Sequence, residues 1–127
     1  MRRMLVSSLC AGAAALVICL FCLVSVANAV GEVERLRLET VRLTQAGDDV
    51  AARERLTRLA TRWQRHTFLL EMISSHDDVH EVTSAIIDAR VCQEMGDTDD
   101  LMRVLEQLGT GLEHIRSIQE ARLSNLY

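Results

Sequence analysis

The segment His76-Asp77-Asp78-Val79-His80-Glu81 holds the densest group of side chains that could bind a metal ion. Two histidines four positions apart on a helix face the same way, and imidazole and carboxylate groups are both zinc ligands. His76, His80 and Glu81 therefore form a candidate metal site, in which His66 is an alternative third ligand to Glu81. No cofactor is predicted, because a structural interpretation of the same residues is simpler.

The structural interpretation assigns these acidic residues to the start of a helix. Carboxylates there accept hydrogen bonds from free N–H groups and complement the helix dipole, and Asp78 with Glu81 has the spacing of a capping box. We expect His76 to lie before the helix, out of line with His80. The pattern H-D-x-x-H also resembles the zinc-protease motif H-E-x-x-H, but Asp77 is shorter than the glutamate that acts as general base there. The sequence thus predicts a protein that is not an enzyme.

A second pattern consists of four arginines at helical spacing. They are Arg55, Arg58, Arg62 and Arg65. The steps of three and four place them in one stripe, which could pair with acids, contact anionic lipid headgroups or bind an acidic partner. Residues 30–66 hold 8 arginines against 6 acids, and residues 67–127 hold 4 against 12. This balance favours solvated ion pairs with the acidic half and disfavours a nucleic-acid partner.

The cysteines offer little chemistry. Cys19-x-x-Cys22 has the spacing of a redox pair, but it lies in an apolar stretch, where thiols behave as small apolar side chains. Cys92 is the only cysteine after residue 29, so an internal disulfide cannot form there. We expect Cys92 to be buried.

The N-terminal segment is long enough to cross a bilayer. Met4 to Val26 is free of charge, and a helix of that length spans roughly 30 Å. Arg2 and Arg3 precede it, so the positive-inside tendency places the N-terminus in the cytoplasm and the remainder outside. Ala27-Asn28-Ala29 alternatively suits cleavage of a secretory signal, which would release a secreted protein. A signal's apolar region is shorter than this one, and the length therefore favours an uncleaved single-pass anchor.

Residues 1–29 thus form an anchor or signal-like segment, and residues 30–127 form one extracytoplasmic domain. The sequence has no proline, and no stretch alternates with the period of a strand, so the domain should be all-α. Glycine and acidic residues divide it into four helical stretches. The expected ranges are Val30–Ala46, which continues the membrane helix, Val50–Ser74, Val79–Met95 and Asp99–Arg122. Short connections predict a small antiparallel three- or four-helix bundle, with Trp63 in its core.

The order of these features resembles a family of small single-span helical proteins from Gram-positive, clostridial-type bacteria whose function is unknown. The residues that carry the resemblance are Trp63, the segment from His76 to Val82, Leu112-Glu113-His114-Ile115 and Leu123-Ser124-Asn125-Leu126. The resemblance implies an uncleaved anchor and a helical extracytoplasmic domain, and no activity. It draws attention to His114 and Asn125, for which structural roles are expected. His114 would cap a helix or pair with an acid on a neighbouring one, and Asn125 would end the last helix at C′.

These features predict a non-enzymatic, membrane-tethered helical module that serves as an interaction or accessory protein outside the cytoplasm. Its partners would be the lipid bilayer and either another membrane protein or a second copy of the chain. The alternatives are a metal- or pH-responsive sensor built on His76 and His80, and a cleaved, secreted helical protein.

Overall fold

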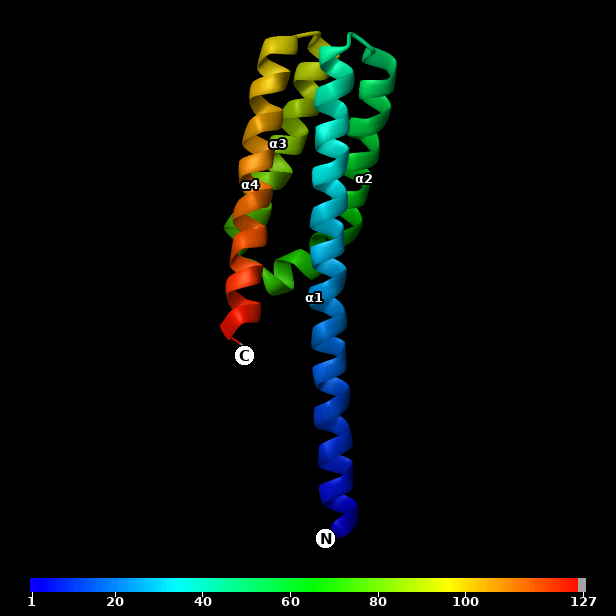
Figure 1. Cartoon of the computed structure of the whole chain (residues 1–127), viewed down its shortest axis with the longest axis vertical. Coiled ribbons are helices and arrows are strands. Elements are labelled where there is room, and N and C mark those ends of the chain that lie inside the picture. The colour runs from blue at the N-terminus through cyan, green and yellow to red at the C-terminus, as the bar shows by residue number, and fades with distance from the viewer. Residues whose placement is uncertain (126–127) are drawn as a thin grey trace.

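The computed structural model describes residues 1–125, with the exception of the Leu123 side chain. Its four helices are α1 (Arg2–Gln45), α2 (Asp49–Ile73), α3 (His76–Met95) and α4 (Thr98–Asn125). Helices that are adjacent in sequence pack together and alternate in direction, and α4 returns to pack against α1 (Figure 1). The predicted all-α bundle is confirmed, with four helices. Leu126, the last residue of the Ser-Asn-Leu motif, lies outside the described part of the chain.

The two glycine turns have the geometry that the sequence predicts. Gly47 after α1 and Gly96 after α3 have φ values of 78° and 72°, in the left-handed region where glycine carries no steric penalty. Each turn also supplies the cap of the next helix. Asp48 accepts a hydrogen bond from the Ala51 N–H at 3.2 Å, and Asp97 accepts one from Asp100 at 3.1 Å.

The third turn differs from the prediction. α3 begins at His76, three residues before the expected start, and its N-cap residue is Ser75. The expected capping box of Asp78 and Glu81 is therefore wrong, because Asp78 already lies within the first turn of the helix. The physical reason is that Ser75, Asp77 and Asp78 all suit a helix start, so that their types alone do not fix the first residue.

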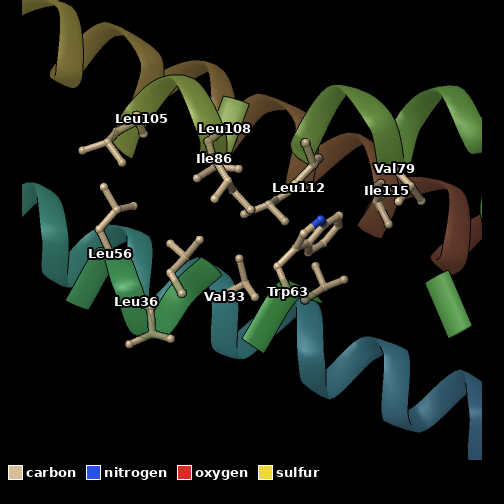
Figure 2. Packing of buried hydrophobic residues seen from close by; sticks show 14 of the residues in the cluster. Val33, Leu36, Leu56, Trp63, Val79, Ile86, Leu105, Leu108, Leu112 and Ile115 are labelled. Atoms are coloured by element: carbon tan, nitrogen blue, oxygen red, sulfur yellow. The ribbon is translucent and has the colours of Figure 1, made fainter. Parts of the chain in front are cut away.

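The core is formed by apolar side chains from all four helices, which Figure 2 shows directed into one interior. The largest side chains that are less than 2% exposed include Leu36, Leu56, Leu59, Leu70, Leu105, Leu108, Leu112 and Ile115. Trp63 is 3% exposed and is confirmed as a core residue. The steps of three and four seen in the sequence thus mark the faces that meet.

α1 is one unbroken helix with two environments. Residues 2–21 are exposed, whereas Val26, Ala29, Val30, Val33 and Leu36 are buried in the bundle. Figure 1 shows the first half of α1 extending alone beyond the other three helices. It is the one helix among residues 1–125 that is long and apolar enough to cross a membrane, and an N-terminal signal sequence would meet the same criteria. The predicted continuation of this segment into the bundle is confirmed.

The end of α2 departs from the bundle axis. Figure 1 shows the last part of α2, in bright green, crossing from α1 toward α4 at the end of the bundle that faces the free half of α1. At this point the Thr67 hydroxyl donates a hydrogen bond to the Trp63 carbonyl at 2.9 Å, a contact that often bends helices. We call this end the span-proximal end. The turns at Gly47 and Gly96 lie at the opposite, distal end.

Candidate functional site

The two histidines of the polar cluster lie side by side at the span-proximal end. Their ring centroids are 6.3 Å apart and the rings are inclined by 16°. The expectation that His76 precedes the helix is wrong, because α3 starts at this residue and aligns it with His80 one turn later. His76 Nδ1 also lies 3.8 Å from a Glu71 carboxylate oxygen, and its side chain is 77% exposed.

A complete metal site does not form around these rings. Across residues 1–125, His, Cys, Asp and Glu side chains form no group of three or more that could hold a metal ion. Glu81 follows His80 directly, so it points about 100° away around the helix. The structure thus brings together two of the three predicted ligands, and metal binding stays a prediction.

The arginine stripe pairs with different acids from those expected. Arg55 Nε lies 3.0 Å from Glu39, Arg62 Nε lies 3.3 Å from Glu32, and Arg58 lies 3.1 Å from Glu54. Glu32 and Glu39 belong to α1, and Glu54 to α2 itself. The prediction of pairing with residues 67–127 is wrong for these three arginines, because antiparallel packing places α1 beside α2.

Arg65, the last member of the stripe, is exposed and forms no ion pair within the described residues. The side chains in the pairs of Arg55, Arg58 and Arg62 are between 30% and 61% exposed. Exposed pairs of this kind contribute about 0–1 kcal/mol each, so they add little to the stability of the bundle.

His114 makes the contact that was expected of it. Its Nε2 lies 3.4 Å from the Asp78 carboxylate, whose side chain is 18% exposed, so the pair links α4 to the first turn of α3. Trp63 makes a second polar link, since its indole N–H donates to the Thr83 hydroxyl at 2.8 Å. Asn125 is the last residue of α4 rather than the C′ residue after it, so the role expected of it is wrong.

A cavity at the distal end was not predicted. It has a volume of about 400 Å³ and includes Thr44, Arg53, Cys92, Gln93 and Leu101 in its lining. Burial raises the pKa of the Cys92 thiol, and the carboxylates of Asp100 and Asp97 raise it further. A thiol in this state is a weak nucleophile at neutral pH. The sequence carries no signal for this cavity, because its lining comes from the ends of four helices that only the fold brings together.

Two exposed apolar surfaces were also missed. On α3, Ile87, Val91 and Met95 are spaced by four residues and are 57%, 49% and 78% exposed. We call them the α3 stripe. At the end of α2, Phe68 and Met72 are 73% and 70% exposed. Both α2 and α3 carry apolar residues on the core face and on the exposed face. The periodicity of apolar residues therefore identified the core face but did not reveal the exposed apolar side chains.

The fold and these surfaces define a class: an all-helical four-helix bundle that is continuous with one candidate membrane span or signal sequence. No protein-family model, curated protein or solved structure matches the chain. The resemblance to the clostridial-type family therefore stays a prediction from the sequence.

Proposed function

We propose that the chain is an uncleaved, membrane-anchored helical module that serves as a non-enzymatic interaction or accessory protein outside the cytoplasm. The observation that carries this proposal is the shared helix α1, which is exposed and apolar in its first half and belongs to the bundle core in its second half. Arg2 and Arg3 at its start favour a cytoplasmic N-terminus by the positive-inside tendency.

The position of Ala27-Asn28-Ala29 supports retention of the anchor. The three residues lie inside α1, with Ala29 4% exposed and the preceding Val26 fully buried. A peptidase would have to unwind the helix and remove both side chains from the core. Burial of a valine side chain alone stabilises a fold by about 1.5–3 kcal/mol. The folded bundle therefore opposes cleavage at this site.

The α3 stripe supports a role in interaction. Its three side chains form one apolar ridge that runs along the bundle, and α2 and α3 make the least extensive contact among the packed helix pairs. Because the bundle stands on its own membrane helix, this ridge faces sideways, toward proteins in the same membrane. The partner is another membrane protein or a second copy of this chain.

Photo-crosslinking in intact membranes tests the proposal. A crosslinking amino acid at Val91 should give a discrete adduct, whereas one at the exposed Thr110 on α4 should give none, and the adduct mass separates a second copy from another protein. Full-length protein with Met1 or Arg2 at its N-terminus should be found in the membrane fraction. A protein that starts at Val30, or a solitary monomer without adducts, would contradict the proposal.

The stacked rings of His76 and His80 favour a pH-responsive sensor as the second candidate. Protonation of both rings would place two positive charges beside each other, and Glu71 would offset part of the repulsion. The exposure of His76 weakens this effect. Under this alternative, the His80→Gln variant would lose a pH-dependent change in crosslinking that the wild type shows, and a zinc titration would report any metal binding.

A further inference from the structure

We infer that Phe68 and Met72 insert into the lipid interface of the membrane that α1 crosses, so that the bundle is seated on the bilayer by a second contact. This inference rests on the proposed membrane anchor and adds the way in which the bundle meets the lipid.

The register between α1 and α2 places these side chains at the right level. Glu39 pairs with Arg55 and Glu32 pairs with Arg62, so seven residues along α1 match seven residues along α2. Phe68 lies six residues after Arg62, and Val26 lies six residues before Glu32. Because the two helices are antiparallel, Phe68 and Val26 lie at about the same level. Val26 is the first buried residue of α1, and Glu32 is the first charged residue after Arg3. The end of α2 therefore reaches the border between the bundle and the apolar half of α1.

The burial of α1 agrees with this level. Cys22, Leu23 and Ser25 are half-buried, although they belong to the apolar stretch, whereas Phe21 is 71% exposed. Val26 and Leu70 belong to the same core cluster. The free half of α1 thus begins near the level at which the end of α2 crosses toward α4 (Figure 1).

The two side chains point away from the bundle. Leu70 is fully buried, and Phe68 and Met72 lie two residues before and after it, about 200° around the helix. They are four positions apart, so they are neighbours on one face. The crossing segment lies at the span-proximal end, between α1 and the last turns of α4, which extend further toward the N-terminus of α1 (Figure 1). Because Leu70 is turned toward the core, Phe68 and Met72 lie on the outer face of this segment. A bilayer that reached the level of Val26 would meet this face together with the end of α4.

The chemistry of the surface suits the lipid interface. A phenylalanine and a methionine supply the apolar face of a short in-plane helical segment, as in interfacial amphipathic helices. Arg65, exposed and unpaired among the described residues, precedes Phe68 by three positions on the same side, where a guanidinium can contact lipid phosphates. A second copy of the chain would fit less well, because the bilayer already occupies this level.

Tryptophan fluorescence of the full-length chain in vesicles tests the inference. The chain has one tryptophan, Trp63, which is buried and gives a fixed background. Three variants each add one tryptophan: Phe68→Trp, Val50→Trp and Phe21→Trp. Each variant is reconstituted in phosphatidylcholine–phosphatidylglycerol vesicles, and the lipids carry a bromine quencher either near the headgroup or deep in the acyl chain. Val50 is 84% exposed at the distal end and is the matched control.

The added emission of Phe68→Trp should be largely lost with shallow bromine and little affected by deep bromine, whereas Val50→Trp should lose none. Phe21→Trp tests the anchor itself. If Phe21→Trp is quenched and Phe68→Trp is not, the anchor stands and the interfacial contact is refuted. Unquenched Phe68→Trp emission that shifts to the blue as protein density rises would assign the surface to a second copy. If neither is quenched, the proposed anchor fails, and the inference fails with it.

Discussion

At the scale of single residues, the polar bond between Trp63 and Thr83 is the most consequential contact between α2 and α3. The Thr83 hydroxyl accepts from the indole N–H at 2.8 Å and donates to the Val79 carbonyl at 2.9 Å. We expect Thr83→Val to leave the indole N–H without its partner, at a cost of about 1–3 kcal/mol in the free energy of unfolding. Chemical unfolding followed by Trp63 fluorescence measures this loss.

Two variants control that measurement. Thr83→Ser keeps the hydroxyl and should recover most of the stability. Thr61→Val removes an exposed hydroxyl that bonds only to the carbonyl of Thr57 in its own helix, and it should change stability by less than about 0.5 kcal/mol. Equal losses in Thr83→Val and Thr61→Val would show that the bond to Trp63 contributes nothing.

Cys92 gives a pH-dependent prediction. Burial and then the charges of Asp100 and Asp97 raise the pKa of its thiol above the usual value. In a variant whose other three cysteines are alanine, alkylation of the folded protein should accelerate at a higher pH than alkylation in urea. Between these two pH values the unfolded chain releases the proton and the folded chain retains it, so stability falls as pH rises. Matching pH profiles in the folded and unfolded states would contradict the prediction.

The ion pairs show which residue contacts the sequence could predict. His114 was expected to pair with an acid on a neighbouring helix, and it lies beside Asp78 of α3. The spacing of the apolar residues around Trp63 identified the core face of α2. The partners of Arg55 and Arg62 were wrong, because summing charge over two halves of the chain ignores which helices become neighbours. Spacing along a helix identifies a face, and the antiparallel register determines what lies opposite.

At the scale of the elements, α1 and α4 approach closely where Arg37 lies over Gly109. Arg37 pairs with Glu34, donates to the Leu105 carbonyl at 3.3 Å, and is 15% exposed. A Cβ atom at Gly109 would lie 2.6 Å from its guanidinium carbon. The hydrogen bond to Glu34 raises the pKa of Arg37 further, so its charge is constant over the accessible pH range.

This crossing predicts energetic coupling between the two residues. Gly109→Ala should gain about 1 kcal/mol of helix stability in the Arg37→Ala background, where no guanidinium obstructs the methyl group. In the wild type the same change must displace Arg37, and the coupling energy should be about 1–2 kcal/mol. Unfolding of the four proteins of this cycle measures it. Gly31→Ala is the control, because a Cβ atom there meets no atom within 4 Å. It should raise the free energy of unfolding equally in the wild type and in Arg37→Ala. Additive effects of Gly109→Ala and Arg37→Ala would refute the coupling.

The elements were predicted unequally for physical reasons. Gly47 and Gly96 mark two turns unambiguously, because the left-handed region suits glycine. The turn between α2 and α3 has no glycine and several capping residues, so its helix start was placed three residues late. The change in direction at the end of α2 has no counterpart in the sequence pattern, because a bond like that from the Thr67 hydroxyl to the Trp63 carbonyl also occurs at Thr40 and Thr44 in the unbroken α1.

At the scale of the whole molecule, the end of the apolar N-terminal segment and the bundle share one core. A chain of residues 30–127, the product of cleavage after Ala29, lacks Val26 and Ala29. Its free energy of unfolding should be about 2–4 kcal/mol lower than that of a chain of residues 24–127. Urea unfolding of the two soluble chains tests this. Removal of residues 1–23, of which Cys22 and Leu23 are half-buried and the rest exposed, should itself leave the bundle folded. Equal stability of the two chains would show that residues 24–29 are dispensable.

Under the proposed anchoring, the unbroken course of α1 also couples rotation inside the bilayer to rotation outside it. Each residue of an α-helix turns the chain by about 100°, and α1 continues through Gly12 and Gly31 without a break. The membrane helix and the bundle therefore turn about a single axis with a fixed phase. A single residue inserted after Leu20 would redirect the α3 stripe by about 100° relative to the first part of the helix. The side of the membrane helix that meets a neighbour in the lipid thus determines which side of the bundle that neighbour meets above it.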